Sequence, residues 1–324
     1  MKIIKAGLLD TVQDAGRYGY RYLGINPGGA MERFSASLAN ALLGKDLNAP
    51  LIEMHFPAAQ ILFQTSAVVC LTGADFTPTI NNEELPLHKP VIIYENPVIE
   101  FKKWRTGARC YLSVLGNFKI EYWLNSYSTN LKAGAGGFKG RRLLKDDVLE
   151  WEGSVLLLAN GRHFETLPWQ YNPPVAHADE IHFIPGAEWD WLTTKAQTLF
   201  LNNTFAITAA SDRMGYRLNG EALQQNKTES LVSSPVAFGT VQLLPDGQLI
   251  ILMADAQTTG GYPRLANVIS ADLPKLAQMN AGATIRFTMT NSKEAEARLA
   301  AQQTYLSALQ NTCGLKMQNR FNAH

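Results

Sequence analysis

Three polar segments of the sequence contain residue types that bind anions and polarise amide carbonyls. They run from Gln13 to Glu32, from Ser211 to Arg217 and from Asp255 to Arg264. Glycine lets backbone N–H groups approach an anion, and the N-terminus of a helix favours negative charge. Because glycine pairs precede an expected helix in the first and third segments, we expect a phosphate or carboxylate cradle there. A tight turn that binds nothing is the alternative.

The first two segments contain related arginine motifs. RYGYRYLG at 17–24 is matched by RMGYRLNG at 213–220, with five of eight residues identical, and Asp14 or Asp212 lies just upstream. The match indicates either coincidence or a duplicated domain with one site-building loop in each half. In the second case the two loops should face one cleft. Replacing Arg213 should then lower activity while changing stability by less than about 1 kcal/mol.

These segments supply the candidate site residues. Catalytic roles are predicted for Asp14, Arg17, Asp212 and Arg213. Substrate binding is predicted for Gln13, Arg21, Gly28, Gly29, Ala30, Met31, Glu32, Arg217, Gln257, Thr258, Thr259, Gly260, Gly261 and Tyr262. Arginine offers a planar donor fork to carboxylates and phosphates, although many surface arginines are only solvated. Within each copy, one arginine is expected to brace the loop through its acidic neighbour, Asp14 or Asp212, and the other to face ligand.

Other motifs argue against several kinds of site. The glycine-rich stretch 133–142 lacks the G-x-x-x-x-G-K-[ST] order of a phosphate loop, so a flexible basic lid is expected. The histidines show neither H-x-x-x-H nor H-E-x-x-H spacing, which argues against a metal site. Cys70, Cys110 and Cys313 form no C-x-x-C pair, and a reducing cytoplasm is therefore expected.

The composition favours small molecules or proteins as partners. The 324 residues are 46% apolar, and 29 Lys and Arg nearly balance 28 Asp and Glu. This balance argues against nucleic-acid binding. No signal segment or run of about 20 apolar residues is present, so no membrane association is expected.

Short runs rich in β-branched residues predict a mainly β fold with a few helices. The expected strands cover 67–71, 91–94, 109–115, 181–184, 204–208, 240–244, 249–253 and 284–289. Helices are expected over Met31–Leu43, Arg264–Met279 and Ser292–Gln310. Prolines around 168–174 indicate a linker, which divides the chain into an N-terminal half (1–165), the linker (166–178), a C-terminal half (179–290) and a terminal helix with a frayed tail (291–324).

Taken together, three long motifs resemble the family that contains the C subunit of 5-oxoprolinase. They are QDAGRYGYRYLGINPGGAMERFSASLAN, SDRMGYRL and LPDGQLIILMADAQTTGGYPRLANVISADLPKLAQ, and the resemblance covers about residues 3–290. It implies two cyclophilin-like β-barrel halves related by internal duplication. It also implies a cytoplasmic complex with the B and A subunits that uses ATP to convert 5-oxoproline to glutamate. No biotin attachment domain is visible, and Glu32 stands where the family pattern has aspartate.

The resemblance extends to two other kinds of protein, which leaves two alternatives open. One is a carboxyltransferase or amidolyase component that acts on a urea-like small amide. The other is a regulatory protein that antagonises a kinase inhibitor of the Kip type. All three hypotheses use the same motifs and a partner protein.

Overall fold

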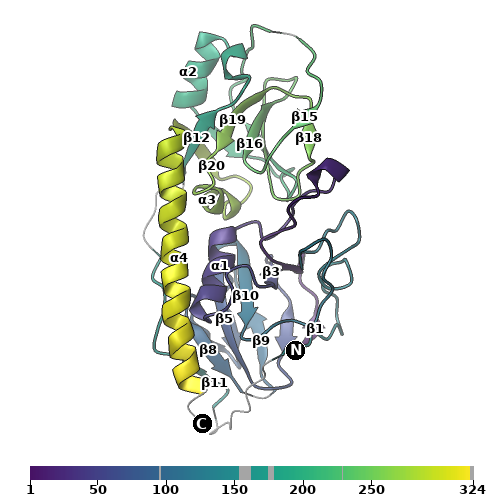
Figure 1. Cartoon of the computed structure of the whole chain (residues 1–324), viewed down its shortest axis with the longest axis vertical. Coiled ribbons are helices and arrows are strands. Elements are labelled where there is room, and N and C mark those ends of the chain that lie inside the picture. Colours follow the sequence, from purple (N-terminus) through teal and green to yellow (C-terminus); the bar gives the residue numbers. More distant parts are fainter. Residues whose placement is uncertain (95, 153–161, 174–178, 228, 322–324) are drawn as a thin grey trace. The chain divides into compact units, whose positions relative to one another are not determined.

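The computed structural model describes the chain except residues 95, 153–161, 174–178, 228 and 322–324 (Figure 1). The chain forms two compact units. Unit 1 comprises Met1–Arg17, Glu32–Pro174 and Gln303–His324, and unit 2 comprises Tyr18–Met31 and Val175–Gln302. The segment 18–31 thus belongs with the C-terminal barrel. The last part of the expected linker and the end of the expected tail lie outside the described residues, and the sequence-based boundaries stay a prediction.

Unit 1 is built on two antiparallel sheets. One has the strand order β1-β4-β9-β6-β7 and the other the order β11-β8-β5-β10-β3-β2. The strands are β1 (Lys2–Lys5), β2 (Thr11–Gln13), β3 (Leu51–Met54), β4 (Gln60–Leu62), β5 (Ala67–Asp75), β6 (Pro78–Ile80), β7 (Glu83–Glu84), β8 (Pro90–Ile93), β9 (Val98–Phe101), β10 (Thr106–Val114) and β11 (Phe164–Thr166).

The central strand β5 is buried on both faces, which explains its continuous apolar run. Val69 and Leu71 join the core of unit 1, whereas Val68 and Cys70 face a second cluster with Leu38 of helix α1 (Arg33–Leu42). Successive side chains of a strand point to opposite faces, so such a strand needs apolar residues at every position. The second cluster also holds Leu306, Cys313 and Met317 from helix α4 (Ser292–Phe321).

Gly44 ends helix α1 where another backbone comes very close. Its φ is +64°, and a Cβ at this position would lie 2.4 Å from the Cα of Gly314 in α4. Gly282 has a similar φ of +88°, but nothing lies within 4 Å of its Cβ position. The two glycines therefore share the left-handed conformation and differ in available space.

We expect Gly44→Ala to lower the free energy of unfolding by at least about 3 kcal/mol, because it adds a backbone clash to the left-handed strain. Gly282→Ala should cost only about 1 kcal/mol, which is the strain alone. Urea unfolding of the two variants tests the difference. Equal losses would mean that the approach of Gly314 does not determine the residue at 44.

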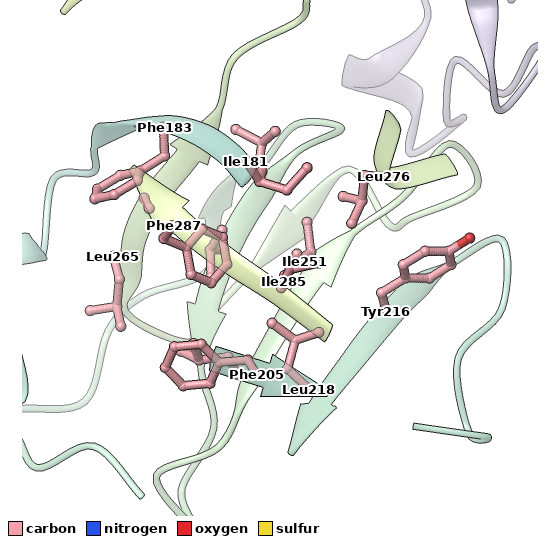
Figure 2. Close-up of a cluster of buried hydrophobic side chains, with 14 of the residues drawn as sticks. Ile181, Phe183, Phe205, Tyr216, Leu218, Ile251, Leu265, Leu276, Ile285 and Phe287 are labelled. Atoms are coloured by element: carbon pink, nitrogen blue, oxygen red, sulfur yellow. The ribbon is translucent and has the colours of Figure 1, made fainter. Parts of the chain in front are cut away.

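Unit 2 contains a closed barrel with the strand order β12-β19-β16-β17-β14-β13-β20. Its strands are β12 (Glu180–Pro185), β13 (Thr204–Ile207), β14 (Gly215–Asn219), β16 (Thr240–Leu243), β17 (Leu249–Leu252), β19 (Arg264–Val268) and β20 (Thr284–Met289); β15 (Ser234–Pro235) and β18 (Thr259–Gly260) form a separate pair. Short helices are η1 (Arg21–Leu23), η2 (Trp189–Trp191), α2 (Thr194–Asn202) and α3 (Leu273–Ala277). Figure 2 shows side chains from the barrel strands gathered in its buried core, among them Phe183, Phe205, Ile251 and Phe287.

The structure confirms the mainly β class, the eight expected strands and a closed barrel. The helix expected over 264–279 is wrong in its first part, because Arg264–Val268 is a barrel strand paired with β12 and β16. The terminal helix begins as expected but continues past Gln310 to Phe321, so the expected fraying of the last dozen residues is wrong for those that the structure describes.

The two octapeptides adopt different structures. Residues 215–219 of the second copy form β14, which pairs with β13 and β17. In the first copy, Arg21–Leu23 form the 3-10 helix η1, and Arg17 belongs to unit 1 whereas the rest belongs to unit 2. Neighbouring strands supply the partners that make the second copy extended. The match therefore does not produce one equivalent loop in each half.

Candidate functional site

A pocket of about 610 Å³ lies against the outer face of the barrel in unit 2. Its position follows from the alternation of side chains along the strands. On β14, Tyr216 and Leu218 enter the barrel core, so Gly215 and Arg217 face outward. The pocket is lined by Ala210, Asp212, Met214, Gly215, Arg217, Gln242, Leu244, Pro245, Asp246, Ile250, Leu252, Gln257 and Tyr262.

The floor of the pocket contains a row of three residues from neighbouring strands. Ile250 of β17 is paired with Arg217 on one side and with Gln242 on the other. Gln242 is buried, and its Nε2 donates to the Tyr262 carbonyl at 3.3 Å. Gly215 lies beside this row, and a Cβ there would lie 2.8 Å from Cδ1 of Ile250, so a larger residue would displace the end of that side chain. The floor thus offers one guanidinium, one amide and an apolar centre.

Asp212 shapes one wall of the pocket. Its Oδ1 accepts hydrogen bonds from the N–H groups of Met214 at 2.7 Å and Gly215 at 3.2 Å. Such a turn fixes the chain just before β14. The carboxylate still lines the pocket, where it adds negative charge.

Arg213 is a buried brace that connects the three predicted segments within unit 2. Its Nε and Nη2 donate to the Asp255 carboxylate at 2.7 and 3.1 Å, and Nη2 also donates to the Gly29 carbonyl at 2.8 Å. Only 6% of the residue is exposed. The bracing acid is therefore Asp255 and not the neighbouring Asp212. A direct contact of Arg213 with substrate stays a prediction, and this burial argues against it.

The third segment also contributes to the lining of the pocket. Gln257 and Tyr262 line the pocket, and the Thr258 carbonyl accepts a 3.5 Å hydrogen bond from Nη2 of Arg21. Thr259 and Gly260 belong to β18, which pairs with β15. Because Pro263 precedes strand β19 and not a helix, the helix N-terminus expected as an anion cradle in this segment is absent from this position. Gly261 is exposed beside β18.

Asp14 and Arg17 organise a different loop, in unit 1. The Asp14 carboxylate accepts from the N–H of Gly16 at 2.7 Å, the N–H of Tyr127 at 2.6 Å and the hydroxyls of Ser126 and Ser128. Arg17 is fully buried, and its Nη2 donates to the Ser128 carbonyl. Its guanidinium also lies 4.7 Å from the centre of the Trp123 ring. These contacts favour a positioning role for both residues.

Gln13 lies in β2 and is also buried. Its Nε2 donates to the Thr11 hydroxyl at 2.9 Å. Since Gln13 belongs to unit 1 with Asp14 and Arg17, whereas the pocket belongs to unit 2, the expected shared cleft stays a prediction.

Glu32 is the N-cap residue of α1, and its side-chain carboxylate accepts hydrogen bonds from the first turn of the helix. Both oxygens accept from the Ser35 N–H, at 2.9 and 3.1 Å, and the Glu32 N–H donates to the Tyr111 hydroxyl at 2.8 Å. That hydroxyl donates to Glu53, and burial together with the carboxylates of Glu53 and Glu32 raises the pKa of Tyr111 well above its usual value. The hydroxyl therefore stays protonated. Glu32 therefore caps the helix, and its predicted substrate contact stays a prediction.

The glycine loop before α1 is also buried. Gly28 and Gly29 have φ of +60° and +92°, and Ala30 is buried. Met31 packs in the barrel core of unit 2. Gly28, Gly29 and Ala30 thus hold a tight turn and Met31 has a packing role, while the substrate contacts predicted for these residues stay predictions.

The structure therefore brings four predicted site residues to one pocket: Asp212, Arg217, Gln257 and Tyr262. Sequence analysis missed Met214, Gln242 and Asp246 in its lining, and Asp255 as the partner of Arg213. The alternation of β16 marks Gln242 as outward-facing, but only pairing with β17 shows what it faces. Among the described residues, no three His, Cys, Asp or Glu side chains are grouped to hold a metal ion. No helix in the described part of the chain has both the length and the apolarity to span a bilayer.

Comparison with known proteins identifies similar chains. Residues 23–289 match the model of the carboxyltransferase domain, subdomain A and B. The chain is 35% identical to the C subunit of 5-oxoprolinase from Haemophilus influenzae over 92% of this chain and 94% of that protein. It is also 35% identical to the corresponding 5-oxoprolinase protein of Escherichia coli, over 95% and 97% of the two chains.

A solved structure shares the fold over nearly the same extent. The urea amidolyase of K. lactis superposes with a TM-score of 0.85 and 25% identity. The match covers 95% of this chain but only 20% of the urea amidolyase chain.

Proposed function

The chain belongs to the family of carboxyltransferase domains that includes the C subunit of 5-oxoprolinase, and we propose that it is this component of a complex that hydrolyses 5-oxoproline to glutamate with ATP. The observation that carries this proposal is the 35% identity to two proteins of that name over almost the whole of both chains. In the reaction, the hydroxyl of water is added to the ring carbonyl carbon, and the C–N bond breaks. The ring nitrogen becomes the amino group of glutamate, while ATP hydrolysis supplies the driving force.

The pocket on the barrel supports a role for this chain in holding the substrate. It has a size common for small-molecule sites, and it presents one arginine and two side-chain amides next to apolar residues. Arginine binds carboxylates strongly, and amides bind the N–H and C=O of a ring amide. Asp212 lines this pocket and also fixes the turn before β14, and Arg213 acts on the pocket indirectly by connecting the surrounding segments.

The A and B subunits of 5-oxoprolinase are the proposed partners, and the complex is proposed to work in the cytoplasm. The name shared by the two relatives indicates a multi-subunit enzyme. The sequence contains no complete phosphate-loop motif, so we propose that ATP is bound mainly by another protein of the complex.

The alternative of a urea-specific carboxyltransferase or amidolyase is less favoured. Identity to urea amidolyase of K. lactis is 25%, and this chain corresponds to only a fifth of that protein. The regulatory alternative predicts partner binding without turnover, so an activity measurement separates it from the proposed function.

We expect the purified chain alone to show no 5-oxoproline-dependent ATP hydrolysis and to gain it when co-purified with the B and A subunits. The reason is that one chain supplies only part of the site. The measurement is phosphate release with and without 5-oxoproline, together with glutamate formation. Urea in place of 5-oxoproline is the control substrate. Turnover by the isolated chain, a complex that prefers urea, or a stable complex without any turnover would each contradict the proposal.

A further inference from the structure

The lining of the pocket contains fewer basic than acidic side chains. Arg217 is the single basic residue of its lining, whereas Asp212 and Asp246 are acidic. The Arg217 backbone bonds with Ser211 and Thr208, but within the described chain no carboxylate lies within 4 Å of its guanidinium. Its side chain is exposed at the outer end of the row Arg217–Ile250–Gln242. In contrast to Arg213, its donor fork is available to a ligand.

We propose that this pocket binds a small organic monoanion through Arg217, and that it is the lactam site of the complex and not its nucleotide site. The inference rests on the proposed function and deepens it. One guanidinium matches one carboxylate, which a carboxylated lactam supplies. The two aspartates then disfavour any ligand with several negative charges, because like charges at short range raise its energy.

The architecture of the pocket also argues against a triphosphate. Phosphates are commonly bound at the first turn of a helix, where free N–H groups and the helix dipole converge. All residues that line this pocket come from barrel strands or the loops between them, and none comes from a helix. The pocket therefore lacks the cradle that a polyphosphate needs.

The remaining lining fits the neutral part of a carboxylated lactam. Ile250 and Leu252 form an apolar surface against which ring methylenes can pack. Gln257 is an exposed residue of the lining, and its side-chain amide can donate to the ring carbonyl and accept from the ring N–H. A ligand with one carboxylate, one amide and a short hydrocarbon edge satisfies each of these groups.

The test compares three ligands on the isolated chain by ligand-observed NMR titration. They are 5-oxoproline, 2-pyrrolidinone, which is the same lactam without the carboxylate, and MgATP. The variant is Arg217→Gln, and the matched control is Arg286→Gln, which removes an exposed arginine from barrel strand β20 outside the pocket. We expect the wild type and the control to bind 5-oxoproline at least about tenfold more tightly than 2-pyrrolidinone. Arg217→Gln should bind the two lactams equally.

The charge argument predicts two further results. MgATP should not displace 5-oxoproline from the wild type. Asp246→Asn keeps an oxygen that can accept from the Gln248 N–H, as Asp246 does at 3.0 Å, but removes a charge. This variant should therefore bind 5-oxoproline about two- to threefold more tightly at low salt.

The inference is overturned if the wild type fails to bind 5-oxoproline, if Arg217→Gln keeps the preference for the carboxylated lactam, or if MgATP competes. The outcome is separable from the proposed function. A complex that turns over 5-oxoproline normally with Arg217→Gln would retain the function and refute the site. An inactive wild-type complex, in which this chain by itself still binds 5-oxoproline through Arg217, would retain the site and refute the function.

Discussion

Replacing Arg213 with alanine should lower the free energy of unfolding of the barrel unit by about 3 kcal/mol. The substitution leaves the Asp255 carboxylate without its two-pronged partner, and it leaves the Gly29 carbonyl without a donor. Breaking a buried ion pair typically costs about 3–5 kcal/mol. The lower end of this range applies because 22% of the Asp255 side chain is exposed to solvent. The loss is larger than the limit of about 1 kcal/mol expected from the sequence alone.

The control is Arg286→Ala in the same barrel. Arg286 pairs with Asp179 at 3.0 Å, but the two side chains are 55% and 47% exposed, so its loss should cost less than about 1 kcal/mol. Urea unfolding followed by circular dichroism measures both variants. Hydrogen exchange of the segments that contain Gly29 and Asp255 locates the effect. If Arg213→Ala were as stable as Arg286→Ala, the buried brace would not stabilise the barrel.

The stability of the wild type relative to Lys45→Met should rise by about 4 kcal/mol between pH 7 and pH 10.5. Burial lowers the pKa of Lys45 from 10.5 to about 7 in the folded chain. Among the described residues, its Nζ donates to two neutral partners, the Val114 carbonyl at 2.7 Å and the Ser113 hydroxyl at 3.3 Å. Between these two pH values the unfolded chain binds the extra proton, so the wild type becomes more stable relative to the variant as pH rises.

The measurement is the difference in unfolding free energy between Lys45→Met and the wild type at about pH 7, 8, 9 and 10, a series that spans the two pKa values. The difference cancels other groups that titrate in this range, such as the buried thiols. Lys132→Met, at an exposed position of unit 1, should show no such dependence. A constant difference across the series would show that Lys45 titrates normally in the folded protein.

The eight expected strands were predictable from the sequence because their apolar runs are strong, and β5 and β17 are examples. Strands β14 and β19 were missed for a physical reason. Gly215-Tyr216-Arg217 is typical of a loop, and it becomes extended because β13 and β17 offer hydrogen-bonding partners on both sides. Likewise, β12 and β16 hold Arg264–Val268 in the sheet. Such partners are distant in sequence, and local patterns do not contain them.

The site was predictable as a set of segments but not as a set of roles. The arginine motif did mark a pocket, and one of its two arginines braces while the other faces outward. Arg213 is the bracing arginine because it pairs with Asp255, which lies 42 residues further along the chain. The glycines at 28 and 29 suggested an anion cradle before helix α1, and the N-terminus of that helix receives the carboxylate of Glu32, which accepts from the Ser35 N–H. A sequence pattern cannot distinguish a ligand carboxylate from an internal one.

Because side chains alternate along β14, neighbouring residues have different requirements, one for the stability of the core and the other for the chemistry of the pocket. Tyr216 and Leu218 maintain the barrel, while Arg217 between them faces the pocket. A mutation at the outward position can therefore alter the ligand without lowering the stability of the core. In a duplicated gene, a few exchanges at outward positions of β14, β16 and β17 would create a barrel for a different small amide. The fold would change little, and the sequence differences would fall at the outward positions, which are every second residue of these strands.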